Sequence, residues 1–130
     1  MDATLSRDER LRSKRALERL FGQGKGGFVY PFRYIYLAGE AAASGDSQPA
    51  DNRPAQVLFT VPKRFHKRAN KRNLLRRRTR EAYRLNKSLL TAGGVRGANI
   101  ALIYSVKDVA DYKRIENAVR KIISQIVEHL

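Results

Sequence analysis

Cysteine and tryptophan are both absent from the 130 residues of this chain. Without cysteine there is no disulfide framework and no thiolate metal site. No apolar run approaches the length of a membrane span, and the polar N-terminus lacks the apolar stretch of a signal peptide. The sequence therefore predicts a cytoplasmic protein with no membrane partner, forming a single domain over residues 1–130.

Acids and histidines are also scarce, with 12 Asp and Glu against 27 Lys and Arg, and only 2 His. A hydrolytic site needs a base, a nucleophile or a metal cage. His66 has no acid near it in sequence, and Glu128 beside His129 would point elsewhere on a helix. Asp108 and Asp111 suit the cap of a helix better than a metal site. We therefore predict no catalytic residue and no metal ligand in this chain.

What the chain has in excess is positive charge, most of it in residues 63–87. This segment holds twelve basic residues and one acid, so it carries +11 of the net charge of +15 and leaves only +4 elsewhere. Arginines recur in it at intervals of four, which forms one slowly drifting row on a helix: Arg68, Arg72, Arg76, Arg80 and Arg84. Asn73, Tyr83 and Lys87 would lie beside this row. An apolar sector for docking on a core is predicted at Leu74, Leu75, Ala82, Leu85 and Leu89.

Aligned like charges repel one another, so a polyanionic partner is the simplest reason to keep them. Arginine also grips phosphate with a planar fork and stacks on bases. A merely solvated charged face, or a helix for a membrane surface or calmodulin, is less well supported, because acids are nearly absent and the apolar sector is narrow. Glu81 is predicted to be an internal counter-ion, with Arg77 and Arg84 both within reach.

Helices and strands can be placed along the rest of the chain. Residues 1–12 are expected to be flexible, and Ser13 is predicted to cap a short helix that ends at Gly22. The glycine-rich stretch 22–27 contains G-x-G-x-x-G without a preceding strand, so it is expected to be a turn. Residues 28–38 are typical of a strand that Pro31 divides or marks as an edge. Residues 39–54 are expected to be a flexible loop.

Two more strands and two helices follow. Residues 55–61 and 98–105 have the apolar character of buried strands. Between them, the basic helix is expected to start near Lys67 or Arg68 and to stop before Gly93. Asp108 or Asp111 is predicted to cap a last helix, whose buried stripe would be Tyr112, Ile115, Val119, Ile122 and Ile126. The resulting order is α-β-β-β-α-β-α, an α+β two-layer sandwich with a four-stranded sheet.

The order of residues around the basic helix matches a known pattern at Val61, Pro62, Lys63, Arg64, Arg68, Ala69, Arg72, Asn73, Arg76, Arg77, Arg80 and Glu81. It resembles the V-x-K-K…R-A-x-x-R-N-x-x-K-R-x-x-R-E signature of the bacterial ribonuclease P protein component. Leu74 departs from it, because many members carry a further basic residue there. Arg78 replaces a usual aliphatic residue, so either this face is shallow or the side chain snorkels. Arg78→Leu is accordingly expected to be neutral or stabilising.

The resemblance implies a left-handed βαβ crossover and a role in an RNA-based enzyme. In that family the RNA subunit holds the catalytic metals, here taken as Mg²⁺, and the protein binds this RNA and the 5′ leader of precursor tRNA. The reaction removes the leader by metal-assisted hydrolysis. Residues implied to bind the RNA subunit are Lys63, Arg64, Lys67, Arg68, Arg72, Asn73, Arg76, Arg77, Arg80 and Arg84.

The resemblance also implies a leader-binding cleft between the first helix and the sheet. Phe21 matches an aromatic position of this cleft, while Leu17 stands where other members carry a second aromatic residue. Tyr34 and Tyr36 share one strand face with Phe32, which fits either a stacking surface for bases or ordinary core. A ribosomal or other structural RNA-binding protein is the alternative function. A stand-alone nuclease is disfavoured by the missing carboxylate cluster.

Overall fold

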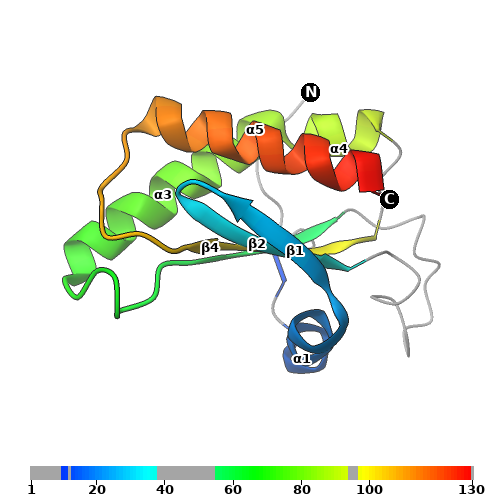
Figure 1. Cartoon of the computed structure of the whole chain (residues 1–130), viewed down its shortest axis with the longest axis horizontal. Coiled ribbons are helices and arrows are strands. Elements are labelled where there is room, and N and C mark those ends of the chain that lie inside the picture. The colour runs from blue at the N-terminus through cyan, green and yellow to red at the C-terminus, as the bar shows by residue number, and fades with distance from the viewer. Residues whose placement is uncertain (1–9, 12, 38–54, 94–96, 130) are drawn as a thin grey trace.

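One four-stranded sheet organises the computed structural model of the chain, which describes residues 10–11, 13–37, 55–93 and 97–129 (Figure 1). The strands are β1 (Lys25–Val29), β2 (Phe32–Leu37), β3 (Gln56–Thr60) and β4 (Asn99–Tyr104), in the order β1-β2-β4-β3. The β1–β2 and β2–β4 pairs are antiparallel, whereas β3 and β4 are parallel. The predicted loop 39–54 lies outside the described residues.

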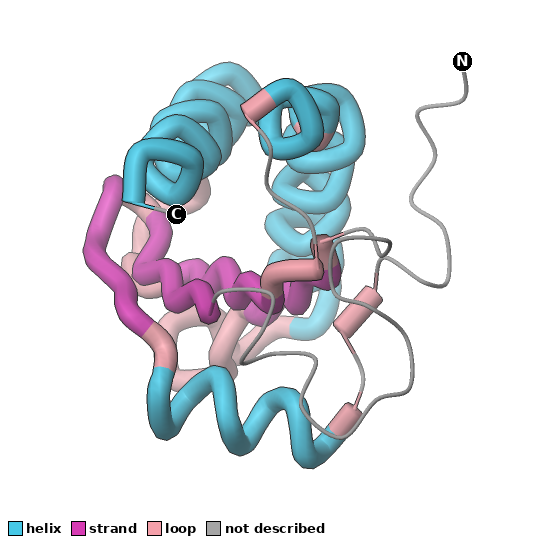
Figure 2. Tube along the Cα trace, turned by 90° about the vertical axis from the view of Figure 1, so that its right-hand side faces the viewer, coloured by secondary structure: helices cyan, strands magenta, loops and turns pink. Residues whose placement is uncertain are grey.

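Helices lie on both faces of this sheet. Helix α1 (Lys14–Gln23) covers part of one face, and α3 (Ala69–Asn86), α4 (Ser88–Ala92) and α5 (Tyr112–His129) lie over the other (Figure 2). The predicted α+β fold and its order of elements are confirmed, although the basic helix is divided into α3 and α4. Helix α3 connects the two parallel strands, and the handedness of this crossover stays a prediction. In the part of the chain that is described, no helix is long and apolar enough to cross a membrane.

The main core lies between the sheet and the α3–α5 layer. Strand alternation sends every second side chain of β2 and β4 into it: Phe32, Tyr34, Tyr36, Ile100, Leu102 and Tyr104. From α5 it receives Ile115, Ala118, Val119, Ile122, Ile123 and Ile126, which confirms most of the predicted stripe. The cap of α5 is also confirmed, and of the two candidates Asp111 provides it, because the Arg114 backbone N–H donates to Asp111 Oδ1 at 2.9 Å.

Helix α3 buries an arc that matches the predicted apolar sector only in part, because Leu75 and Ala82 are buried as predicted and the rest differs. Its buried residues are Leu75, Thr79, Ala82 and Tyr83, whereas Leu85 and Leu89 are 49% and 41% exposed. The helix lies in the angle between β3 and α5, so the buried arc turns toward the sheet. The Tyr83 ring meets the Phe59 ring of β3 with 5.6 Å between centroids. The expectation that Tyr83 lies beside the arginine row is therefore wrong.

A smaller cluster on the opposite face holds α1 against the sheet: Leu11, Leu20, Leu37 and Ala101. The predicted cap of α1 is confirmed, because the Ala16 N–H donates to Ser13 Oγ at 3.3 Å. The helix passes Gly22 and ends at Gly24, whose N–H donates to the Leu20 carbonyl at 2.8 Å. A Cβ at Gly24 would lie 2.6 Å from Ile35 Cγ2 and 3.0 Å from the Tyr36 carbonyl oxygen of β2, so the close approach of this segment to the sheet requires glycine.

Two expectations for the N-terminal part are corrected. The stretch from Lys25 onward is not a turn, because Gly26 and Gly27 pair with β2 as part of strand β1. Residues 10–11 are not flexible, since Arg10 bridges to Val57 and Leu11 is 2% exposed. The division at Pro31 is confirmed, because Tyr30 and Pro31 form the turn between β1 and β2.

Candidate nucleic-acid interface

The solvent-facing side of α3 carries a set of cations. Asn73, Arg76, Arg77 and Arg80 are all exposed there. Residues three or four positions apart share a face of a helix, so these four side chains lie on one face and the buried Leu75 and Thr79 lie on another. Since acids are almost absent from this segment, the face presents guanidinium groups to solvent with little internal neutralisation.

Arg72 and Arg84 differ from the other arginines of the predicted row, because both are half-buried and bonded within the protein. Arg72 Nε donates to the Val61 carbonyl at 3.0 Å. Arg84 Nε donates to Glu81 Oε2 at 3.0 Å, which lowers the pKa of the Glu81 carboxyl. The structure thus selects Arg84 rather than Arg77 as the partner of Glu81.

Arg78 lies on the inner side of α3 and has a structural contact. Its Nη1 donates to the carbonyl of Ala110 at 2.7 Å, in the segment before α5. Ala110 is buried, so this oxygen has little access to water. The face is therefore not simply shallow, and leucine at this position would leave a buried acceptor without its donor.

The loop before α3 adds four exposed cations: Lys63, Arg64, Lys67 and Arg68. His66 anchors this loop, being 6% exposed with Nε2 placed 2.8 Å from the Val106 carbonyl. Because a carbonyl only accepts hydrogen bonds, Nε2 carries the proton. The His66 ring also meets the Tyr104 ring edge-on at 5.5 Å. His66 therefore ties the cationic loop to the core.

Arg10 joins the α3 cations, although sequence reasoning missed it. The Leu11 N–H donates to the Val57 carbonyl at 3.0 Å, which holds this segment along the edge of β3. A groove of about 200 Å³ results, and Arg10, Arg76 and Arg80 all line it. No local pattern could have found Arg10, because its position depends on pairing with a strand about fifty residues later.

A second candidate region is the cleft between α1 and the uncovered end of the sheet. It has a volume of about 420 Å³ and is lined by Phe21, Gly24, Gly26, Gly27, Phe28, Arg33, Tyr34 and Ile35. Phe21 of α1 is 51% exposed and Phe28 of β1 is 57% exposed. Arg33 pairs with Phe28 across the β1–β2 hairpin, so its exposed side chain shares that face.

Of these cleft residues, sequence reasoning identified Phe21 and Tyr34 but missed Phe28 and Arg33. Side chains alternate between the two faces of a strand, so Arg33 lies on the other face of β2 from Phe32 and Tyr34. The sequence alone was sufficient to predict this position. The face of Phe28 depends on the hairpin register, which the sequence alone did not supply. Gly26 and Gly27 have no side chains that could fill the cleft, so it stays open beside the two rings.

Tyr34 and Tyr36 belong to the core and offer little ring surface on which a base could stack, so their role in leader binding stays a prediction. Tyr34 borders the cleft, but the two residues are only 6% and 7% exposed. Their rings stack on each other under α5 with 6.2 Å between centroids, and the Tyr34 hydroxyl donates to Gln125. Leu17 is half-buried and packs against the smaller hydrophobic cluster, so it does not offer a free stacking surface.

The acids do not gather anywhere in the described ranges. Among those residues, no group of three His, Cys, Asp or Glu side chains lies close enough to hold a metal ion. Asp111 caps α5, and Glu81 is paired with Arg84. These side chains therefore do not fit a metal centre held by the protein itself.

Together, the α+β fold, the cationic face of α3 and the cleft with exposed aromatic rings define an RNA-binding protein. The family model described as Ribonuclease P matches residues 5–127. The chain belongs to the ribonuclease P protein family, whose members are protein subunits of a tRNA-processing ribonucleoprotein endoribonuclease. It therefore associates with an RNA subunit and with precursor tRNA, and the ribosomal alternative is not favoured.

Individual relatives agree with this assignment. The Ribonuclease P protein component of Porphyromonas gingivalis is 34% identical over 125 residues, covering 94% of this chain and 85% of the relative. That of Chlorobaculum tepidum is 46% identical over 90 residues, covering 67% of this chain and 53% of the relative. The solved Staphylococcus aureus RNase P protein superposes with a TM-score of 0.69 at 15% identity, covering 91% of this chain and 94% of that one.

Proposed function

We propose that the two surfaces divide the work of binding RNA. The cationic face of α3 and the loop before it bind the catalytic RNA subunit, through Arg76, Arg77 and Arg80 above all. The α1 cleft binds the single-stranded 5′ leader of precursor tRNA. The observation that carries this proposal is the exposure of Phe21 and Phe28 beside Arg33 in one open cleft.

Each surface has chemistry suited to its ligand. Guanidinium groups neutralise closely spaced phosphates and bind them through paired N–H donors. Aromatic rings stack on bases of any sequence, which suits a leader that varies between tRNAs. Arg33 can bind a phosphate next to a stacked base. Arg72 and Arg84 are less suited to bind phosphate than the exposed arginines, because part of each guanidinium already bonds within the protein.

The chain itself supplies binding rather than bond cleavage in this proposal. Mg²⁺ would be held mainly by phosphates of the RNA partner and would supply the activated water for phosphodiester hydrolysis. The contribution of the protein is to position the leader and to offset repulsion between the two RNAs. We propose a cytoplasmic location, where precursor tRNA would be available.

Reconstitution with the cognate RNA tests this division of work. The protein alone should not cut precursor tRNA at any Mg²⁺ concentration, whereas the RNA alone should retain some cleavage at high Mg²⁺. Adding the protein should lower the Mg²⁺ requirement and favour substrates that carry a leader over mature tRNA. Specific cleavage at the mature 5′ end by protein free of RNA would contradict the proposal.

The salt dependence of binding tests the electrostatic part separately. Each neutralised phosphate releases roughly 0.7–0.9 of a counterion, so a plot of log affinity against log salt should have a slope steeper than about −3. Replacing Arg76 and Arg80 together by alanine should make this slope shallower by about 1.4–1.8. A flat slope for the wild type would show that phosphate binding does not dominate.

A further inference from the structure

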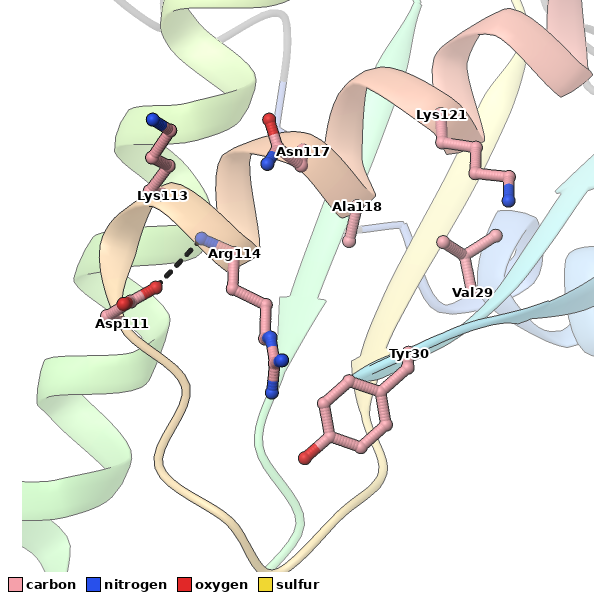
Figure 3. A pocket seen from close by; sticks show the side chains of 8 residues that line it. All are labelled: Val29, Tyr30, Asp111, Lys113, Arg114, Asn117, Ala118 and Lys121. Atoms are coloured by element: carbon pink, nitrogen blue, oxygen red, sulfur yellow. Dashed lines mark hydrogen bonds between the residues drawn. The ribbon is translucent and has the colours of Figure 1, made fainter.

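A separate groove lies between α5 and the β1–β2 hairpin, on the side of the sheet opposite to the α1 cleft. It has a volume of about 740 Å³, larger than either the α1 cleft or the Arg10 groove. Val29 and Tyr30 form its wall on the hairpin, and one face of α5 forms the other wall (Figure 3). Its polar lining residues are Tyr30, Asp111, Lys113, Arg114, Asn117 and Lys121.

The spacing along α5 explains why these side chains meet. Arg114, Ala118 and Lys121 are separated by four and three residues, so they lie on one face of the helix. Figure 3 shows Arg114 extending from α5 toward the Tyr30 ring and Lys121 reaching down beside Val29. The small Ala118 side chain between the two cations leaves the middle of the groove open.

Tyr30 is held in place within this groove. Its hydroxyl donates to Asp108 Oδ2 at 2.5 Å, and the Arg114 guanidinium lies over its ring at 5.4 Å from the centroid. The residue is nevertheless 38% exposed, so part of the ring faces solvent. A guanidinium that rests on an aromatic ring keeps its N–H groups free to bind an anion in the plane of the fork.

The charges of the groove are unbalanced. Asp111 is the one acid among its lining residues, and its carboxylate already accepts the Arg114 backbone N–H as the cap of α5. In the described parts of the chain, neither Arg114 nor Lys121 forms an ion pair with a carboxylate. The groove is therefore lined by three cations (Lys113, Arg114 and Lys121), an amide and an exposed ring, a combination that favours a phosphate-bearing ligand over an uncharged one.

The groove also adjoins the α1 cleft along strand β1. Residues 26–28 of β1 line the α1 cleft, and the next two residues, Val29 and Tyr30, line the α5 groove. The two sites therefore follow one another along β1 but lie on opposite faces of the sheet, because side chains alternate along a strand. Because β1 is an edge strand, an RNA in the α1 cleft that continued around this edge would bring further backbone to the groove.

We propose that the α5 groove is a further RNA-binding site, which takes a phosphodiester backbone between Arg114 and Lys121. Its residues differ from those of the α3 face and of the α1 cleft, and it lies on the side of the sheet opposite to the α1 cleft. The proposal does not depend on the leader occupying the α1 cleft, because the RNA subunit and the precursor tRNA offer the same phosphate chemistry.

Matched single substitutions in the full chain test the site. Lys121→Ala and Arg120→Ala remove the same charge from adjacent, exposed positions of α5, but only Lys121 lines the groove. Arg114→Ala is the second groove variant, and Lys121→Arg should preserve binding. Binding is measured against salt in two arms, to the RNA subunit alone and, with the reconstituted holoenzyme, to precursor tRNA. Thermal unfolding of each variant verifies that the fold is intact.

The groove variants should make the salt slope shallower by about 0.7–0.9 for each phosphate that the protein no longer neutralises, with little change for Arg120→Ala. A change confined to the first arm would assign the groove to the RNA subunit, and a change confined to the second would assign it to precursor tRNA. Either result supports the site. Equal effects of Lys121→Ala and Arg120→Ala, or no effect of either groove variant, would overturn it.

Discussion

The two faces of the sheet use the same kinds of residue for opposite purposes. On the α5 side, Phe32, Tyr34 and Tyr36 are covered by a helix layer and bury nearly all of their surface. On the α1 side, Phe28 and Arg33 come from the same hairpin and remain exposed, because α1 covers only part of that face. Aromatic residues thus form core or binding surface according to what is packed over them.

Charged residues show the same division. Arg78 points inward from α3 and donates to a buried carbonyl, whereas Arg77, its neighbour in the chain, is exposed. One guanidinium connects two elements, and the other is available to a partner. A count of arginines along a helix therefore overstates the binding surface, since part of the charge is used to hold the fold together.

The largest expected difference is in stability. Phe32→Ala should lower the free energy of unfolding by about 3–5 kcal/mol, because it leaves a cavity in the covered core. Phe28→Ala should change it by no more than about 0.5 kcal/mol, since its ring is largely exposed. Denaturant titration of the two variants measures both values. Similar losses of unfolding free energy for the two variants would mean that Phe28 is packed as tightly on the α1 side as Phe32 is on the α5 side.

Arg78→Leu should destabilise the protein by about 1.5–3 kcal/mol, because it removes a charged donor from the buried Ala110 carbonyl. The control is Arg77→Leu, which should leave the unfolding free energy within about 0.5 kcal/mol of the wild type. Thermal or denaturant unfolding gives both numbers. If Arg78→Leu were neutral or stabilising, the hydrogen bond to Ala110 would not stabilise the fold. The expectation from sequence, that an aliphatic residue suits this position, would then be correct.

On the α1 side of the sheet, substitution of an exposed ring should change RNA binding rather than stability. Phe21→Ala and Phe28→Ala should each reduce the preference for precursor tRNA over mature tRNA by about 1–3 kcal/mol, if one base stacks on each ring. The affinity of the reconstituted enzyme for both substrates, wild type against variant, is the measurement. Affinity for the RNA subunit should not change. Equal loss on the two substrates would place the leader elsewhere.

The smallest effect is expected at the Glu81–Arg84 pair, on the rim of the covered side. Glu81→Gln should cost about 0.3–0.5 kcal/mol near neutral pH, as is usual for a half-exposed helix pair. The pKa of Glu81 is lower in the folded state, so its contribution is present above the unfolded value of about 4.5 and is lost as pH falls through the folded one. Unfolding measured at neutral and acidic pH should show the two proteins converging in acid.

The amino-acid pattern by itself determined the class of fold and the position of the cationic helix. Arginines four residues apart, with acids almost absent, are sufficient to predict a helix that binds a polyanion, because helical geometry is local. The caps at Ser13 and Asp111 and the apolar stripe of α5 were predictable for the same reason. Each depends on residues within a few positions of one another.

Tertiary structure alone decided which predicted residues remain available to a partner. Tyr34 and Tyr36 are covered because α5 returns over β2, and Phe28 is open because the hairpin register turns it toward the partly covered face. Arg10 reaches Arg76 only through pairing with β3, and Arg114 meets Tyr30 only where α5 begins beside the hairpin. All four outcomes depend on packing between segments distant in sequence, and local periodicity carries no information about that packing.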